Sequence, residues 1–262
     1  MKGADMDRLW LKEYPAGVPH DIKPEEYTSV VELLEDSLKK YADQPISVCM
    51  DVWMKYGELD KLSQQLGVWL QSLQLEPDAR VAIMLPNIPQ FAVSMAGVLR
   101  AGYTCVNVNP LYTARELEHQ LKDSGATTII ILENFAHTLA EVIARTPIKH
   151  VCMTSMGDLL GAAYGAWITF AVRHLAKMVP KFEIPLDGRN VTPFKKALSM
   201  GAGKPLRKPQ VNHDSIAFLQ YTGGTTGLSK GAVLTHRNII AATLQAEAWF
   251  APAYQGQTNL SK

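Results

Sequence analysis

The chemically most distinctive part of the sequence is the stretch YTGGTTGLSKG, residues 221–231. Glycine lets the backbone adopt positive φ angles and approach a ligand closely, and successive free N–H groups form a concave site for an anion. Threonine and serine hydroxyls add short hydrogen-bond donors, and Lys230 adds a positive charge. Together these residue types predict a loop that binds phosphate groups.

This stretch differs from a Walker A loop, which has the sequence GxxxxGK[ST] and leads into a helix. Here Leu228 and Ser229 separate Gly227 from Lys230, and Gly231 follows the lysine. The apolar residues 216–219 and 232–234 predict a strand on each side, so we do not expect a helix N-terminus to bind the phosphate. The alternative is a surface turn between two hairpin strands, because glycine-rich loops are common.

The elements before this loop alternate between apolar runs and amphipathic segments. Strands of valine, isoleucine and leucine that alternate with helices predict an α/β fold with a mainly parallel sheet and helices on both faces. Thr113 and Glu116 form a capping box at the start of one helix, and Gly125 follows its end. We expect strands at 81–85, 103–108, 127–132 and 150–153, and helices at 27–41, 57–73, 88–100, 113–124, 135–145 and 193–200. The helix at 88–100 has few polar residues and is expected to be buried on most sides.

Residues 159–172 are almost wholly apolar, and basic residues follow them. Thr169, Arg173, Lys177 and Lys181 are spaced by four, so a helix over 159–181 would carry one basic stripe on an apolar body. We favour a core helix, since apolar stretches are usually buried. The alternative is an interfacial helix whose aromatic residues contact acyl chains while the basic residues contact anionic headgroups.

Composition excludes several classes of protein. Lysine and arginine number 26 against 25 acidic residues, and this balance argues against a nucleic-acid partner. Cys49, Cys105 and Cys152 are widely spaced and odd in number, which indicates three reduced, buried thiols. The N-terminus carries charges where a signal peptide would be apolar, and no apolar run reaches about 18 residues. We therefore expect a soluble cytoplasmic chain.

Several motifs together point to a known family. Residues 221–231 resemble the phosphate loop of the adenylate-forming enzymes, and MKYGEL at 54–59 is similar to an early motif of that superfamily. GVLRAG at 97–102, followed by NVNPLY at 107–112, is similar to the next motif. The likeness extends from about residue 9 to about residue 240 and is strongest to the bacterial long-chain fatty acyl-CoA synthetases. Gly223 stands where the superfamily usually has serine or threonine, a variant found in the long-chain group, and Ser229 stands where it usually has proline.

The resemblance implies that the chain is a truncated N-terminal subdomain of the adenylate-forming fold. The superfamily's later motifs, its hinge and its catalytic lysine have no counterpart here, so we assign no catalytic residue and expect the fragment alone to be inactive. We expect residues 1–75 to belong to a neighbouring sheet of the whole enzyme, 76–245 to form the α/β subdomain, and 246–262 to be a truncated tail. The first and last segments are expected to be loosely held or to make contacts between chains.

The chemistry implied is ligation of a fatty acid to coenzyme A (CoA). The fatty carboxylate attacks the α-phosphate of Mg-ATP to give an acyl-adenylate and pyrophosphate, and the CoA thiol then displaces AMP. The alternatives are a fatty acyl-AMP ligase, which stops at the adenylate, and a non-catalytic module that binds ATP or a membrane. A monomer and an oligomer remain alternatives. A peripheral position on the inner face of the membrane is a further hypothesis.

The residues expected to bind the ATP phosphates are those of the loop, with Thr222 also expected to contact magnesium. They are Tyr221, Thr222, Gly223, Gly224, Thr225, Thr226, Gly227, Leu228, Ser229, Lys230 and Gly231. For Tyr221 we favour a strand residue that packs under the loop. His119 is expected to be structural, and for His236 a site residue and a cap of the next helix remain alternatives.

Overall fold

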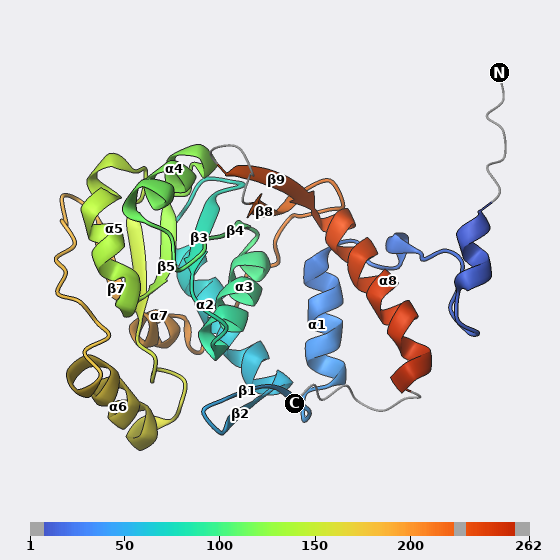
Figure 1. Ribbon diagram of the computed structural model, residues 1–262, viewed down its shortest axis with the longest axis horizontal. Coiled ribbons are helices and arrows are strands. Elements are labelled where there is room, and N and C mark those ends of the chain that lie inside the picture. The colour runs from blue at the N-terminus through green and yellow to red at the C-terminus, as the bar shows by residue number, and fades with distance from the viewer. Residues whose placement is uncertain (1–7, 223–228, 255–262) are drawn as a thin grey trace.

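The computed structural model of this chain describes residues 8–222 and 229–254. Its centre is a seven-stranded sheet in the order β7-β6-β5-β3-β4-β8-β9, in which all neighbouring strands are parallel except the antiparallel pair β8–β9 (Figure 1). A separate antiparallel hairpin, β1–β2, forms a second sheet. The mainly parallel α/β architecture that the sequence predicted is confirmed.

The predicted strands and helices of the central sheet are found with bounds that differ by a few residues at most, but the edge strand β7 was not predicted. The strands are β1 Pro45–Cys49, β2 Val52–Lys55, β3 Arg80–Met84, β4 Thr104–Asn107, β5 Thr128–Leu132, β6 His150–Thr154, β7 Asn190–Pro193, β8 Ile216–Thr222 and β9 Lys230–Thr235. The α-helices are α1 Val30–Lys40, α2 Tyr56–Ser72, α3 Pro89–Ala101, α4 Ala114–Ser124, α5 Ala136–Val142, α6 Ala162–Phe170, α7 Phe194–Gly201 and α8 His236–Tyr254.

Two hydrophobic cores lie on opposite faces of the sheet, because successive side chains of a strand point in opposite directions. On β3, Val81 and Ile83 enter the core formed with α1, α2, α3 and α7. Ala82 and Met84 enter the core formed with α4 and α5. All four side chains are fully buried, so both faces of the sheet are covered, as a parallel sheet requires.

The helix ends show why these segments begin and stop where they do. The Ser29 side chain accepts a hydrogen bond from the backbone N–H of Glu32 at the start of α1. The capping box of Thr113 and Glu116 at the start of α4 is confirmed, and Gly125 ends this helix in the left-handed conformation with φ of 65°. These caps satisfy backbone groups that a helix end leaves unpaired.

The chain before residue 76 is more firmly packed than expected. Leu66, Trp69 and Leu70 of α2 are at most 1% exposed and belong to the same core as the sheet. The expectation that this segment is loosely held is therefore wrong for α2, because α2 packs along α3 and α7. The hairpin β1–β2 was not predicted.

The C-terminal segment also departs from the expectation. Helix α8 runs from His236 to Tyr254, past Pro252, and so crosses the boundary expected at residue 246. The ring of Trp249 meets the ring of Tyr14 edge to face, with centroids 5.2 Å apart. In Figure 1, α8 lies beside α1.

The segment at 159–181 is the clearest failure of the sequence prediction. Helix α6 ends in a π-helical turn, Ala171–Leu175, and Lys177 adopts a positive φ of 52°, so the predicted four-residue basic stripe does not form. The core-helix interpretation is also wrong, since Gly165 is the only buried residue of α6. Tyr164, Trp167 and Phe170 are all more than 40% exposed.

Two of the three cysteine side chains are buried as the sequence predicted. Cys105 and Cys152 are buried, as expected, whereas Cys49 in β1 is only half-buried. Among the described residues, we find no helix with the length and apolar character needed to cross a bilayer.

Candidate functional site

The predicted phosphate loop joins the two strands of the antiparallel hairpin β8–β9. Thr222 at the end of β8 pairs with Lys230 at the start of β9, and both side chains are exposed. The strands predicted on either side of the loop are therefore confirmed. The six loop residues predicted to bind phosphate between them lie outside the described residues: Gly223, Gly224, Thr225, Thr226, Gly227 and Leu228.

The hairpin stands at the carboxyl end of the parallel strands. β8 runs parallel to β4, with Asn107 opposite Gln220, and the Asn107 side-chain amide donates to Gln220 Oε1 at 2.9 Å. Gln120 of α4 donates to the backbone oxygen of Asn107 at 2.8 Å. Ligands of open α/β sheets bind outside the carboxyl ends of the strands, so the hairpin is at the edge where a ligand is expected.

Tyr221 packs within the hairpin. It pairs across the strands with Gly231, and a Cβ atom added to Gly231 would lie 2.9 Å from Cζ of the tyrosine ring. The tyrosine hydroxyl donates to Oδ2 of Asp123 at 2.5 Å. Burial, and then the hydrogen bond to Asp123, raise the pKa of Tyr221 well above its usual value. The interpretation of Tyr221 as a packing residue is confirmed, and its phosphate contact stays a prediction.

His119 and His236 have different surroundings. Nε2 of His119 lies 3.1 Å from the backbone oxygen of Ser229, at the exit of the loop. His236 is the first residue of α8 and is 2% exposed, and its Nδ1 accepts a hydrogen bond from the backbone N–H of Val30 at 3.0 Å. His236 therefore joins α8 to α1.

A magnesium ion at this site fits the residues only as part of a metal–nucleotide complex. Mg²⁺ keeps several waters and binds proteins through one or two oxygen ligands plus substrate phosphates. Thr222 supplies one exposed hydroxyl at the hairpin end. Within residues 8–222 and 229–254, no group of three or more histidine, cysteine, aspartate or glutamate side chains is arranged to hold a metal.

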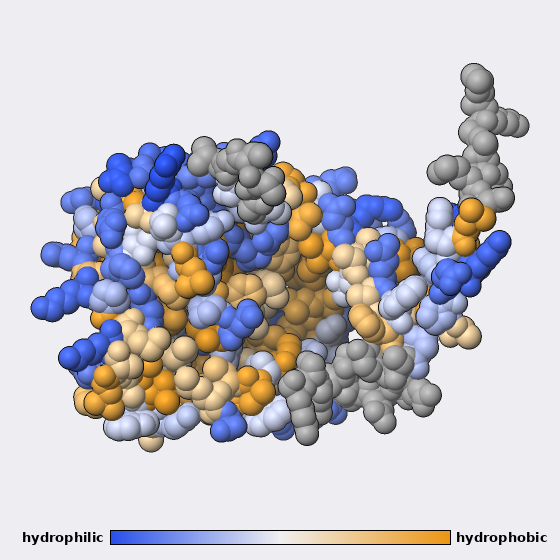
Figure 2. All heavy atoms as spheres, viewed as in Figure 1, coloured by the Kyte–Doolittle hydropathy of each residue, from blue (hydrophilic) through white to orange (hydrophobic). Residues whose placement is uncertain are grey.

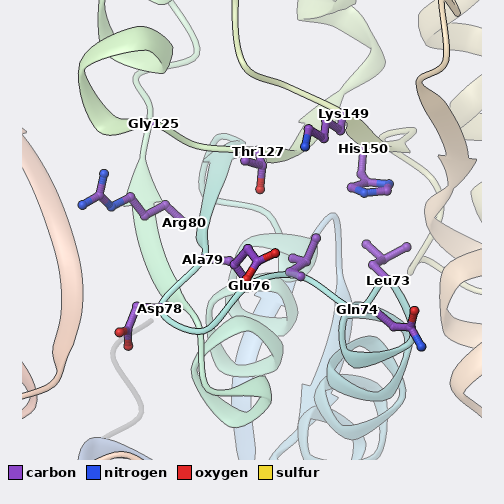
Figure 3. A pocket seen from close by; sticks show the side chains of 11 residues that line it. Leu73, Gln74, Glu76, Asp78, Ala79, Arg80, Gly125, Thr127, Lys149 and His150 are labelled. Carbon is purple, nitrogen blue, oxygen red and sulfur yellow. The ribbon is translucent and has the colours of Figure 1, made fainter.

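Away from the hairpin, a hollow of about 410 Å³ lies at the opposite edge of the sheet, where β3, β5 and β6 begin (Figure 3). Its lining includes Glu76 and Asp78 as well as Arg80 and Lys149. Burial, and then the charge of Lys149, lower the pKa of His150. Because charges of both signs line this hollow and it lies away from the hairpin, it does not favour one ligand chemistry. Nothing in the sequence singled it out.

Comparison with known proteins gives a family match over most of the chain. Residues 34–259 match the family described as AMP-binding enzyme. A long-chain-fatty-acid–CoA ligase of Yersinia pestis is 47% identical over 97% of this chain and 45% of its own length. The corresponding ligase of Salmonella typhimurium is 48% identical over 94% of this chain and 44% of its own length. One from Bacillus subtilis is 32% identical over 94% of this chain and 43% of its own length.

Solved structures give the same fold at lower identity. A long-chain-fatty-acid-CoA ligase from Archaeoglobus fulgidus matches with a TM-score of 0.66 and 22% identity, over 90% of this chain and 42% of that one. An anthranilate CoA ligase bound to anthranoyl-AMP matches with a TM-score of 0.64 and 20% identity, over 82% of this chain and 37% of that one.

The fold is the one found in these solved CoA ligases. The chain belongs to the AMP-binding enzyme family, as the sequence resemblance predicted. It spans about 45% of the length of the curated relatives it matches.

Proposed function

We propose that this chain is part of a long-chain fatty acid–CoA ligase. The observation that carries the proposal is identity of 46–48% to several bacterial proteins of that name over at least 94% of this chain. The hairpin supports it, because it places Thr222 and Lys230 on either side of the glycine-rich sequence. The names of these relatives favour a CoA ligase over an enzyme that stops at the adenylate.

The reaction proposed has two steps. A carboxylate oxygen of the fatty acid attacks the α-phosphorus of ATP, which forms the acyl-adenylate and releases pyrophosphate. The sulfur of CoA then attacks the acyl carbon and releases AMP. Negative charge grows on the leaving pyrophosphate in the first step, so donors fixed around it lower the barrier. Magnesium, bound with the nucleotide, supplies further charge stabilisation.

In this chain the loop residues are proposed to surround the β- and γ-phosphates. Lys230 makes a charge-assisted contact, and the Thr222 hydroxyl contacts the metal or a phosphate oxygen. Such contacts stabilise a bound anion by about 1.5–3 kcal/mol each. The part of the proposal that this chain can test is therefore phosphate binding.

The test is binding of inorganic tripolyphosphate with Mg²⁺, measured by calorimetry, since this probe needs neither the ribose nor the adenine contacts. We expect Lys230→Ala to weaken binding about 12- to 160-fold, which corresponds to that range of free energy. Lys204→Ala, at another exposed lysine, is the matched control and should bind as the parent chain does. If Lys230→Ala binds tripolyphosphate as tightly as Lys204→Ala does, the proposed role of the loop in phosphate binding is wrong.

We also propose that residues 1–75 and the end of α8 contact a neighbouring part of the whole enzyme. The hairpin β1–β2 supports this, because Val48, Met50 and Trp53 are more than 40% exposed on a sheet of only two strands. Met54 attaches the hairpin to the core, and pairing with a further sheet would add the strand neighbours that two strands alone lack. A second copy of the chain is the alternative partner.

A peripheral contact with a membrane is proposed through α6 and the turn after it. The exposed residues Trp167, Phe170, Leu175 and Met178 are apolar, and Figure 2 shows apolar atoms gathered in this part of the molecule. The charged side chains between residues 159 and 182 are Arg173, Lys177 and Lys181, and all three are basic. An apolar helix flanked by basic residues is suited to an anionic lipid surface.

Polar contacts hold α6 against the body of the protein and leave its apolar side outward. Arg173 forms an ion pair with the buried Glu133, with 2.6 Å between Nη2 and Oε2. The hydroxyls of Thr169 and Ser155 are 3.1 Å apart. The exposed apolar side is therefore fixed in place by contacts on the opposite side of the helix.

Co-sedimentation with vesicles tests this contact. The parent chain should bind phosphatidylglycerol-containing vesicles more tightly than phosphatidylcholine vesicles, and Lys177→Gln with Lys181→Gln should abolish most of that difference. Trp167→Ser should weaken binding to both. Trp53→Ser is a close control, because both tryptophans are 55% exposed. Equal losses for Trp167→Ser and Trp53→Ser would show that α6 is not the contact.

A further inference from the structure

One face of α4 contacts β8 and the residue just before β9 in the phosphate-loop hairpin. His119 and Asp123 are one helical turn apart, so they lie on the same side of α4. His119 Nε2 lies 3.1 Å from the backbone oxygen of Ser229, just after the loop. Asp123 Oδ2 accepts the hydrogen bond from the Tyr221 hydroxyl at 2.5 Å, just before the loop. A single helix therefore holds the entry and the exit of the loop.

Helix α4 is itself firmly fixed. Leu117 and Leu121 are fully buried in the core on this face of the sheet. The capping box at its start and the left-handed Gly125 at its end satisfy backbone groups at both termini. Arg80 of β3 donates to the backbone oxygen of Ser124 at 2.6 Å. A helix fixed at both ends is a rigid support for whatever it contacts.

The position of Gly231 completes this arrangement. The Tyr221 ring crosses the place where a side chain at residue 231 would lie, and it thereby reaches Asp123. The glycine is needed for this packing whether or not a phosphate is bound. Gly231 therefore lets the tyrosine join the hairpin to α4.

We infer that α4 positions the phosphate loop, with His119 and Asp123 as positioning residues for phosphate binding. The inference rests on the proposed phosphate-binding function of the hairpin. Tyr221 and Ser229 are the residues through which α4 contacts the hairpin, and immobilising binding groups around an anion costs conformational entropy. Fixing both ends beforehand removes part of that cost, so binding is tighter without any new contact to the ligand.

The hydrogen-bond partners define the chemistry of each contact. The Ser229 oxygen is an acceptor, so His119 must carry its proton on Nε2 to donate to it. Asp123 must accept from the tyrosine hydroxyl. His119→Gln and Asp123→Asn keep a donor and an acceptor at these positions, whereas His119→Leu and Asp123→Ala remove them.

Two measurements on this chain test the inference. The first is the affinity for Mg²⁺ and inorganic tripolyphosphate, which we expect to fall about 2- to 12-fold in His119→Leu and in Asp123→Ala, the range expected for loss of one typical hydrogen bond. The second is the rate of tryptic cleavage after Lys230, which should rise in the same variants. His119→Gln and Asp123→Asn should restore both values towards those of the parent chain.

Glu118→Gln is the matched control on α4. Among the described residues, Glu118 pairs with Lys122 and Arg145, neither of which belongs to the hairpin, so its loss should change neither measurement. A thermal unfolding curve for each variant identifies any that fail to fold, and the Gln and Asn variants then carry the comparison.

The outcomes separate this inference from the proposed function. If the Leu and Ala variants bind tripolyphosphate and are cleaved as the parent chain is, α4 does not position the loop. If the Gln and Asn variants lose as much affinity as the Leu and Ala variants, the hydrogen bonds are not responsible and the inference is wrong. If the parent chain binds no tripolyphosphate, the proposed function fails in this chain, and positioning of a binding loop fails with it. Faster cleavage would then support only a structural contact between α4 and the hairpin.

Discussion

Helices α3 and α6 are both rich in apolar residues, yet the protein buries one and exposes the other. Ten of the thirteen residues of α3 are buried, against one of the nine in α6. Helix α3 lies between the sheet and α2, and a Cβ atom added to Gly97 would be 3.1 Å from Leu66 of α2. Helix α6 instead brings Gly165 against the backbone of Gly157, in the loop after β6.

The difference shows that apolar composition alone does not determine burial. Helix α3 connects β3 and β4, parallel neighbours in the middle of the sheet, and it fills most of the short connection 85–103, so it lies on the sheet. Helix α6 lies between β6 and the edge strand β7, in a connection with enough chain to leave the sheet. The position in the topology decides which apolar helix becomes core.

The largest expected difference between the two helices is in the unfolding free energy lost when one side chain of each is truncated. Leu99→Ala in α3 should lower the free energy of unfolding by about 2–5 kcal/mol, because it leaves a cavity at a side chain that is 2% exposed. Trp167→Ala in α6 should change it by less than about 0.5 kcal/mol, as is usual at the surface. Urea unfolding of both variants measures the difference. Similar losses would mean that α6 is also part of the core.

The region where α8 packs against α1 should also make the stability of the protein depend on pH. Burial, and then the charge of His213, lower the pKa of His236 from 6.5 to about 4 in the folded chain. Between these pH values the unfolded chain binds more protons, so stability is lost as the pH falls from about 6.5 to about 4. The difference of 6.5 minus 4 corresponds to about 3 kcal/mol.

The measurement is the free energy of unfolding as a function of pH, in the parent chain and in His236→Gln. Glutamine keeps an acceptor for the Val30 N–H and has no proton to gain. We expect a smaller loss of stability in the variant over this pH range. Identical pH profiles would show that His236 is not the group responsible.

The smallest effect on stability is expected from removing the ion pair that holds α6 against the rest of the protein. Arg173→Gln leaves the Glu133 carboxylate buried without its cation, but Arg173 is nearly half exposed, so water screens much of the interaction. We expect a loss of about 1 kcal/mol in unfolding free energy and faster hydrogen exchange in α6. Exchange that rises equally in α3 would contradict a local role for this ion pair.

The central sheet was predictable because its signals are local. Strands β3 to β6 are short apolar runs separated by capped helices, and Thr113, Glu116 and Gly125 mark the ends of α4 within a few residues. The hairpin β1–β2 was missed because its exposed Val48, Met50 and Trp53 conceal the usual alternation. The environment of α6 could not be predicted, since it depends on where the sheet ends.

The candidate site was predictable only in part. The glycine-rich motif indicates the loop and its flanking strands, but nothing local indicates that Tyr221 contacts Asp123, 98 residues earlier. The contact between His119 and Ser229 spans 110 residues. Such contacts follow from the way α4 lies beside the hairpin, which the linear pattern does not contain.

The close approach of Gly231 to the Tyr221 ring changes how a mutational scan of this motif would be interpreted. Any side chain at residue 231 meets the tyrosine ring before it meets a ligand. A scan scored by activity would therefore mark Gly231 as a phosphate-binding residue, although the defect would be in the folding of the hairpin. Paired scans, one scored by activity and one by protein abundance, would separate Gly231 from Lys230.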